Sequence, residues 1–99
     1  MYQPKPIDTA GVRLPESLEA LTELIAQNVH DIWALGRIRE GWVWGETKDS
    51  VRKTTPLLVP YAELPESEKA YDRDTALETL RLILKLGYEI RPAERATDL

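Results

Sequence analysis

The hydrophobic positions in the first half of the chain repeat with the period of an α-helix. They follow one another at intervals of three and four: Leu18, Leu21, Ile25, Val29 and Ile32. This spacing places them on one stripe, which we expect to form part of the core. Pro15 suits a first helical turn and Gly41 suits a stop. The pattern predicts a helix that begins at Leu14–Ser17 and ends at about Arg37 or Arg39.

A similar start signal appears later, where Leu64-Pro65-Glu66-Ser67 resembles the first one. We expect a short helix over residues 66–71 and a longer one over residues 75–86, with Asp72 or Asp74 as its N-cap. The longer segment carries leucines on two sides: Leu77, Leu80 and Leu84 on one, Leu82 and Leu86 on the other. A helix that is apolar on two sides lies centrally or at a subunit contact.

The remaining segments lack helical periodicity. Trp42-Val43-Trp44 between two glycines predicts a short strand, and residues 88–90 predict another. Pro56 and Pro60 leave residues 57–59 as an extended connection. We expect residues 1–13 to form an extended arm anchored by Ile7 and Val12, residues 14–91 to form the domain, and residues 92–99 to fray. The fold class is therefore mainly α with short β-strands.

Composition narrows the setting. A chain of 99 residues suits one domain. The absence of cysteine excludes disulfides and thiolate metal sites and favours a reducing, cytoplasmic location. We find no bilayer-length apolar run and no signal-peptide pattern, and expect no membrane association. The net charge of −4 argues against binding to a nucleic acid polymer.

Residues 36–53 reverse this charge balance locally. They carry five basic and three acidic residues: Arg37, Arg39, Lys48, Arg52 and Lys53 against Glu40, Glu46 and Asp49. The segment is either a solvated face or a pocket for a small anion.

Catalysis lacks the residues it needs. His30 is the single histidine, there is no cysteine, and the serines lack a nucleophile context. One histidine cannot supply a zinc site, and no glycine-rich phosphate loop is present. We therefore expect a non-catalytic protein with no cofactor and no metal.

Three residues of the first helix form a candidate binding stripe. His30, Trp33 and Arg37 stand at i, i+3 and i+7, and Ala26 leaves room beside them. An indole can stack a base while a guanidinium holds an anion. Alternatively, Trp33 closes the core with Arg37 lying over it. Trp42 and Trp44 share one face of a strand, and we expect at least one of them to pack in the core.

Two longer stretches resemble the signature of ryanodine receptor repeat (RyR) domains, which reads N-x-H-x-x-W and then R-I-x-x-G-W-x-[YW]-G. The matching stretches are Asn28-Val29-His30-Asp31-Ile32-Trp33 and Arg37-Ile38-Arg39-Glu40-Gly41-Trp42-Val43-Trp44-Gly45. Further matches are Lys53, Pro56, Leu58-Val59-Pro60-Tyr61 and Leu86-Gly87-Tyr88. The resemblance implies two long helices with a short antiparallel strand element. A single copy resembles the free-standing prokaryotic members, which are thought to sense ligands or to bind partners.

The resemblance also implies a ligand. Tandem RyR repeats pack with two-fold symmetry and are associated with adenine nucleotides. The residue matching Trp33 stacks on the base, that matching Arg37 faces phosphate, and that matching His30 lies nearby. A homodimer would reproduce the tandem arrangement and bring two copies of Trp33 together.

The candidate ligand-binding set is therefore His30, Trp33, Arg37, Asn28, Trp42 and Lys53. Leu57 departs from the basic residue that some repeats carry after the proline, so Lys53 or Arg52 is the candidate substitute. Asn28 is also compatible with an ordinary polar surface residue. The alternative function is a protein interaction or scaffold domain with no small-molecule ligand.

Overall fold

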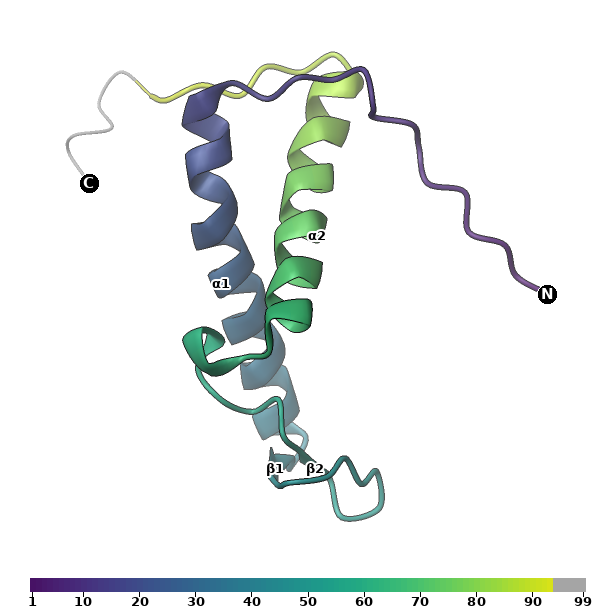
Figure 1. The fold of residues 1–99 in the computed structure, drawn as a ribbon, viewed down its shortest axis with the longest axis vertical. Helices are drawn as coiled ribbons and strands as arrows, with labels where there is room; N and C mark the ends of the chain where they lie inside the picture. The colour runs from purple at the N-terminus through teal and green to yellow at the C-terminus, as the bar shows by residue number, and fades with distance from the viewer. Residues whose placement is uncertain (94–99) are drawn as a thin grey trace.

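The computed structural model describes residues 1–93 and is mainly helical. Helix α1 (Glu16–Arg39) and helix α2 (Glu66–Lys85) run antiparallel and side by side (Figure 1). A connection at one end of the pair holds strands β1 (Val43–Trp44) and β2 (Thr54–Thr55) and the 3₁₀ helix η1 (Tyr61–Glu63). Within residues 1–93, neither helix combines the length and the apolarity needed to cross a bilayer.

The predicted bounds of α1 are confirmed. The carbonyl of Pro15 accepts hydrogen bonds from the N–H groups of Leu18 and Glu19, which closes the first turn. The helix ends at Arg39, two residues before Gly41, whose φ of 93° lies in the left-handed region that glycine tolerates.

The prediction of two separate helices in the second half is wrong, because α2 runs without interruption from Glu66 to Lys85. Asp72 and Asp74 lie inside this helix rather than at a cap. An aspartate in a helix interior costs only roughly 0.7 kcal/mol relative to alanine, and no proline or glycine lies in the segment to stop the helix.

The two strands pair in parallel, so the expected antiparallel element is a second correction. Val43 is opposite Thr54, and Trp44 is opposite Thr55. The loop between the strands reverses direction, and Asp49 forms an antiparallel bridge with Thr54. Because of this reversal, β2 runs in the same direction as β1. Gly45, directly after β1, lies very close to Thr54 of β2. A Cβ at position 45 would come within 2.6 Å of the Cβ of Thr54, so only glycine fits without a shift. The expected strand over residues 88–90 does not form.

The core consists of two small clusters, one between the two helices and one between α1 and the connection. One is built from Leu14, Leu18 and Leu80, and the other from Ala26, Tyr61 and Leu64. The predicted core stripe of α1 is only partly right, because Leu21 is 41% exposed and Ile32 is 62% exposed. The cause is geometric: α2 and η1 cover the side of α1 that carries Leu18 and Ala26, and they leave the adjacent apolar side open.

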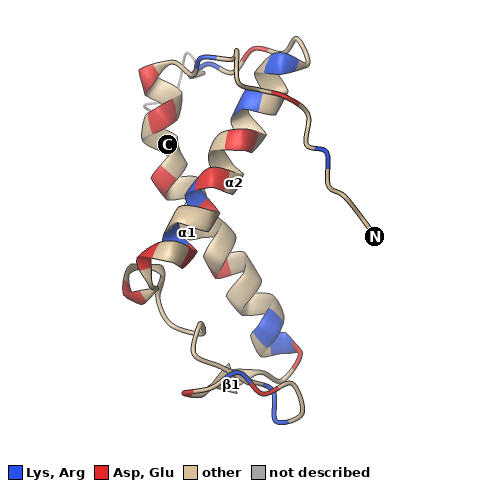
Figure 2. Cartoon of the chain, turned by 45° about the vertical axis from the view of Figure 1, so that its right-hand side comes forward, with Lys and Arg blue, Asp and Glu red and all other residues tan. Residues whose placement is uncertain are grey.

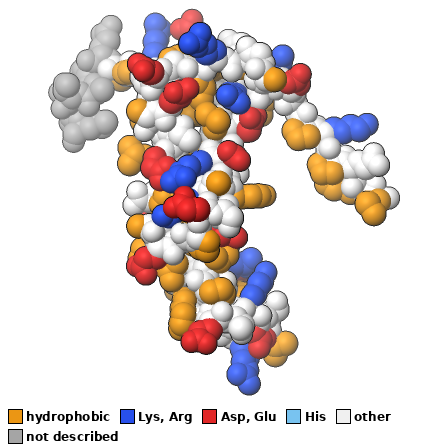
Figure 3. All heavy atoms as spheres, in the orientation of Figure 1, with side chains coloured by type: hydrophobic (Ala, Val, Ile, Leu, Met, Phe, Trp, Pro, Cys, Tyr) orange, Lys and Arg blue, Asp and Glu red, His pale blue; other side chains and the backbone are white. Residues whose placement is uncertain are grey.

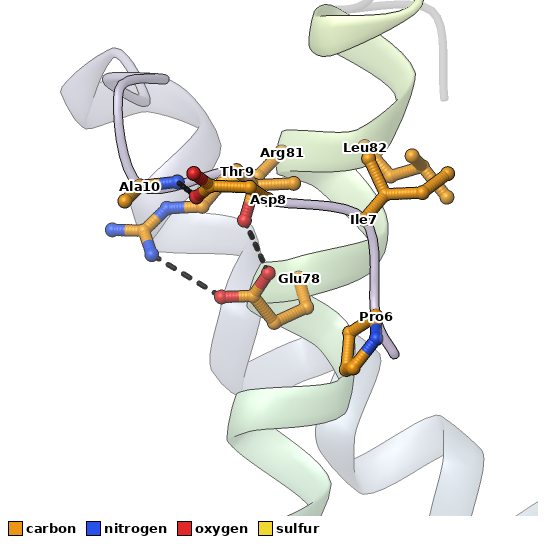
Figure 4. A pocket seen from close by; sticks show the side chains of 8 residues that line it. All are labelled: Pro6, Ile7, Asp8, Thr9, Ala10, Glu78, Arg81 and Leu82. Atoms are coloured by element: carbon orange, nitrogen blue, oxygen red, sulfur yellow. Dashed lines mark hydrogen bonds and ion pairs between the residues drawn. The ribbon is translucent and has the colours of Figure 1, made fainter. Parts of the chain in front are cut away.

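The N-terminal arm is fixed by a polar contact. The Thr9 hydroxyl is buried and donates a hydrogen bond to the Glu78 carboxylate of α2 (Figure 4). Ile7, one of the predicted anchors, is 55% exposed, whereas Val12 is half-buried. The expected frayed tail lies largely outside the described residues, since these end at Ala93.

An ion pair ties the helices together beside the second core cluster. The Arg73 guanidinium of α2 donates two hydrogen bonds to the Glu23 carboxylate of α1 and also lies 3.6 Å from Glu66. The hydrogen bonds between Arg73 and Glu23 lower the pKa of Glu23 and raise the pKa of Arg73. Burial of the Tyr61 hydroxyl raises its pKa, and the neighbouring Glu23 carboxylate raises it further.

This ion pair predicts a pH-dependent stability. The folded pKa of Glu23 is depressed below its ordinary value of 4.5, so its contribution is present above that pH and is lost as the pH falls through the folded pKa. We expect Glu23→Gln to lower the melting temperature at neutral pH. The difference from the wild type should shrink below pH 4.5 and disappear under more acidic conditions. Thermal unfolding monitored by circular dichroism at a series of pH values measures this difference in melting temperature.

The control is Glu19→Gln, which changes an exposed glutamate of the same helix that forms no ion pair with residues 1–93. A difference for Glu23→Gln that stays constant down to about pH 3 would contradict the interpretation.

Candidate functional site

A cavity of about 320 Å³ opens between the end of α1 and the start of α2. Its walls come from three segments: His30, Trp33 and Arg37 on α1; Lys48, Leu57 and Leu64 on the connection; and Glu68, Tyr71 and Asp72 on α2. The structure thus brings the three residues of the predicted stripe together in one concave site. Its size falls at the lower end of the range for small-molecule pockets.

His30 lines this site and is itself buried. Its side chain is 5% exposed, and its Nε2 lies 2.7 Å from the carbonyl oxygen of Val59. Because a carbonyl oxygen only accepts hydrogen bonds, Nε2 carries the proton and donates. The imidazole also stacks on Trp33, with ring centroids 5.6 Å apart and planes inclined by 26°. This contact orients the indole.

Arg37 lies between two tryptophans. Its guanidinium carbon is 5.8 Å from the ring centroid of Trp33 and 5.1 Å from that of Trp42. One guanidinium nitrogen donates a 3.0 Å hydrogen bond to Glu40, and the side chain remains 38% exposed. The result is a stacked column of imidazole, indole, guanidinium and indole that runs from α1 to Trp42, the residue before β1. Cation–π contacts of this kind hold Arg37 in place while part of its charge faces solvent.

The cavity carries charges of both signs. Arg37 and Lys48 face it from one side, and Glu68 and Asp72 face it from α2. Formally the four charges cancel, so the site is not the simple anion pocket that the basic segment suggested. A ligand that fits it combines a flat ring, one anionic group and hydrogen-bond donors for the two carboxylates.

The α2 wall was missed by sequence reasoning. Glu68, Tyr71 and Asp72 stand at i, i+3 and i+4, which places them on one face of a continuous helix. Assigning a break at Asp72 concealed this face. The absence of any helix breaker between residues 66 and 85 is the signal that could have revealed it.

The other predicted site residues lie elsewhere. Asn28 is exposed on α1 and does not line the cavity. Lys53 also lies outside the cavity, with a φ of 57°, and its ammonium donates a 2.7 Å hydrogen bond to the carbonyl oxygen of Glu40. Trp42 supports Arg37 from outside the lining. Of the predicted set, only His30, Trp33 and Arg37 line the cavity.

A larger hollow of about 750 Å³ separates the N-terminal arm from α2. The view in Figure 4 shows its polar groups engaged with one another: Thr9 donates to Glu78, and Arg81 donates to the same carboxylate. The rest of its lining includes Pro6, Ile7 and Leu82. No group of three or more histidines or carboxylates suited to a metal ion occurs among residues 1–93.

A comparison with protein families identifies the type of domain. Residues 2–92 match the RyR domain family. The chain belongs to the RyR domain family. The match covers almost the whole chain, including the N-terminal arm and both helices, and the family consists of non-enzymatic repeats.

The position of His30 predicts a structural role for its imidazole. We expect His30→Leu to lower the free energy of unfolding by about 1–3 kcal/mol, because the half-buried carbonyl of Val59 would lose its donor. The urea midpoint would fall with little change in the slope of the transition. Trp44→Ala, at a side chain 54% exposed, is the control and should shift the midpoint little. An unchanged midpoint for His30→Leu would show that the hydrogen bond contributes nothing.

Proposed function

We propose that this RyR domain is a non-catalytic, cytoplasmic module that binds an adenine nucleotide or a nucleotide derivative in the cavity between α1 and α2. The observation that supports the proposal most directly is the convergence of Trp33, Arg37 and Lys48 on one concave site. An aromatic face and two cations are the groups that a base and a phosphate require. The site lies within a single chain, so its lining does not depend on a second copy.

The stacked column explains how a base would enter. His30 approaches Trp33 from the preceding turn of α1, and Arg37 approaches it from the following turn. In this proposal the base takes the place of the Arg37 guanidinium against the indole. The guanidinium exchanges its hydrogen bond with Glu40 for one with phosphate, while Trp42 continues to support it. His30 keeps the indole in orientation throughout.

The carboxylates of α2 restrict the ligand further. Glu68 and Asp72 would accept hydrogen bonds from the ribose hydroxyls and repel additional phosphates. The proposal therefore favours ligands with few phosphates, such as AMP, or with a second sugar, such as ADP-ribose, over ATP.

Isothermal titration calorimetry with AMP, ADP-ribose and ATP tests the proposal. We expect Trp33→Ala to raise the dissociation constant about 5- to 150-fold, which corresponds to the roughly 1–3 kcal/mol of one stacked base. Trp44→Ala, which removes an exposed tryptophan outside the cavity, should leave the dissociation constant unchanged. No heat from any of the three ligands at about 1 mM would refute nucleotide binding.

A second candidate, a protein interaction or scaffold role, is favoured by the surface around the strands. Val43 is 58% exposed, Trp44 is 54% exposed and Val51 is 92% exposed. Exposed tryptophan is enriched at binding hot spots. Here the partner would be another protein, and no small molecule would be required.

The two candidates differ in the residue on which binding depends. For the interaction role, we expect a pull-down that Trp44→Ala abolishes, that Trp33→Ala preserves, and that added nucleotide does not change. Capture that survives Trp44→Ala would exclude this surface as the interface.

A further inference from the structure

We propose that the open apolar side of α1 is a self-complementary surface on which a second copy of this chain docks, with the two α1 helices antiparallel. This surface, which we call the α1 open face, consists of four hydrophobic residues around one amide: Leu21, Leu24, Asn28, Ile32 and Leu35. The proposal does not depend on nucleotide binding.

The α1 open face is exposed and continuous. Leu24, Ile32 and Leu35 are 63%, 62% and 53% exposed, and Leu21 is 41% exposed. At about 100° per residue, the five positions fall within an arc of roughly 80°, and Leu21 to Leu35 covers about 21 Å of helix. Figure 3 shows hydrophobic side chains at the surface of the molecule, among the charged and polar ones. A stripe of this kind on a helix is the pattern of a packed face rather than of scattered surface leucines.

The spacing of the α1 open face identifies its occupant. The intervals between the five residues are three, four, four and three, which read the same in both directions from Asn28. When an identical helix lies against it in the opposite direction, Leu21 meets Leu35 of the second copy and Leu24 meets Ile32. Such a match of one surface with itself is what a two-fold dimer requires.

Asn28 provides the centre of this arrangement. In the antiparallel register it lies opposite Asn28 of the second copy, and a carboxamide both donates and accepts hydrogen bonds. Two such groups on the two-fold axis satisfy each other. A single amide within an apolar helix contact also fixes the register, because any slip would leave it unpaired against leucine.

Charge supports the same direction. The first turn of α1 carries Glu16 and Glu19, and the last turn carries Arg37 and Arg39. Figure 2 shows this separation as acidic residues at one end of α1 and basic residues at the other. In the antiparallel register Arg39 comes near Glu16 of the second copy, and the opposed helix dipoles attract. A parallel pair would place like charges together at both ends.

The dimer would leave the cavity free. Ala26 and His30, which mark the side of α1 turned to the core and the cavity, lie on the side of the helix away from the α1 open face. The two cavities would therefore face outward, on opposite sides of the assembly. This differs from the two-fold arrangement that the family resemblance suggested, in which two copies of Trp33 come together.

Sedimentation velocity over a concentration series tests the association. We expect the wild type to form dimers, and Leu24→Glu and Ile32→Glu each to raise the dimer dissociation constant at least tenfold, because a carboxylate would be buried in the contact. Leu86→Glu is the matched control, since Leu86 is 61% exposed but lies after α2. All variants should keep the wild-type circular dichroism spectrum, because the substituted side chains are exposed.

Cysteine crosslinking tests the register, and the chain contains no native cysteine to interfere. Asn28→Cys should form a disulfide-linked dimer under mild oxidation, because the two thiols would meet on the axis. Leu21→Cys should crosslink with Leu35→Cys when the two variants are mixed, and Glu19→Cys, on the opposite side of α1, should not crosslink. A monomer throughout the concentration series, a dimer that withstands both glutamate variants, or efficient crosslinking of Glu19→Cys would overturn the proposal.

Discussion

The antiparallel contact between α1 and α2 is the constraint on which the rest of the structure depends. Two helices have only one interface, so each can be covered along one side. The core is correspondingly small, built around Leu18 and Leu80 at one end and Ala26 and Tyr61 at the other. No large side chain among residues 1–93 is fully buried. Which side of α1 faces inward then decides where the cavity and the exposed apolar side of this helix lie.

The candidate site is one consequence. α1 extends beyond the start of α2, so its last turns are covered by the connection instead, and the cavity forms where helix cover ends. The contact of His30 with Val59 and the stacking of Arg37 between Trp33 and Trp42 occupy the same stretch of α1. Groups that stabilise the connection and groups that would bind a ligand therefore form one continuous column. A substitution of Arg37 would therefore remove contacts with both Trp33 and Trp42.

The open side of α1 is the other consequence. Sequence periodicity treats Leu21 and Ile32 as core residues, and in one copy they are not. A helix whose apolar surface is wider than its single neighbour can cover has either surplus hydrophobicity or a second contact. The palindromic spacing around Asn28 favours the second contact.

The sequence by itself determined what depends on nearby residues. The bounds of α1, the left-handed turn at Gly41 and the alignment of His30, Trp33 and Arg37 all follow from local spacing and from the conformations that glycine and proline allow. The sequence was also sufficient to recognise the RyR domain, because the motif residues lie in short continuous stretches.

The tertiary structure decided what depends on contacts between distant segments. These are the parallel direction of β1 and β2, the continuity of α2 through Asp72, the carboxylate wall of the cavity, and the side of α1 that is buried. Local propensities for these features are small, about 1 kcal/mol or less per residue, and packing overrides them. Periodicity shows that a helix has an apolar side, but only the position of its neighbour determines how much of that side is covered.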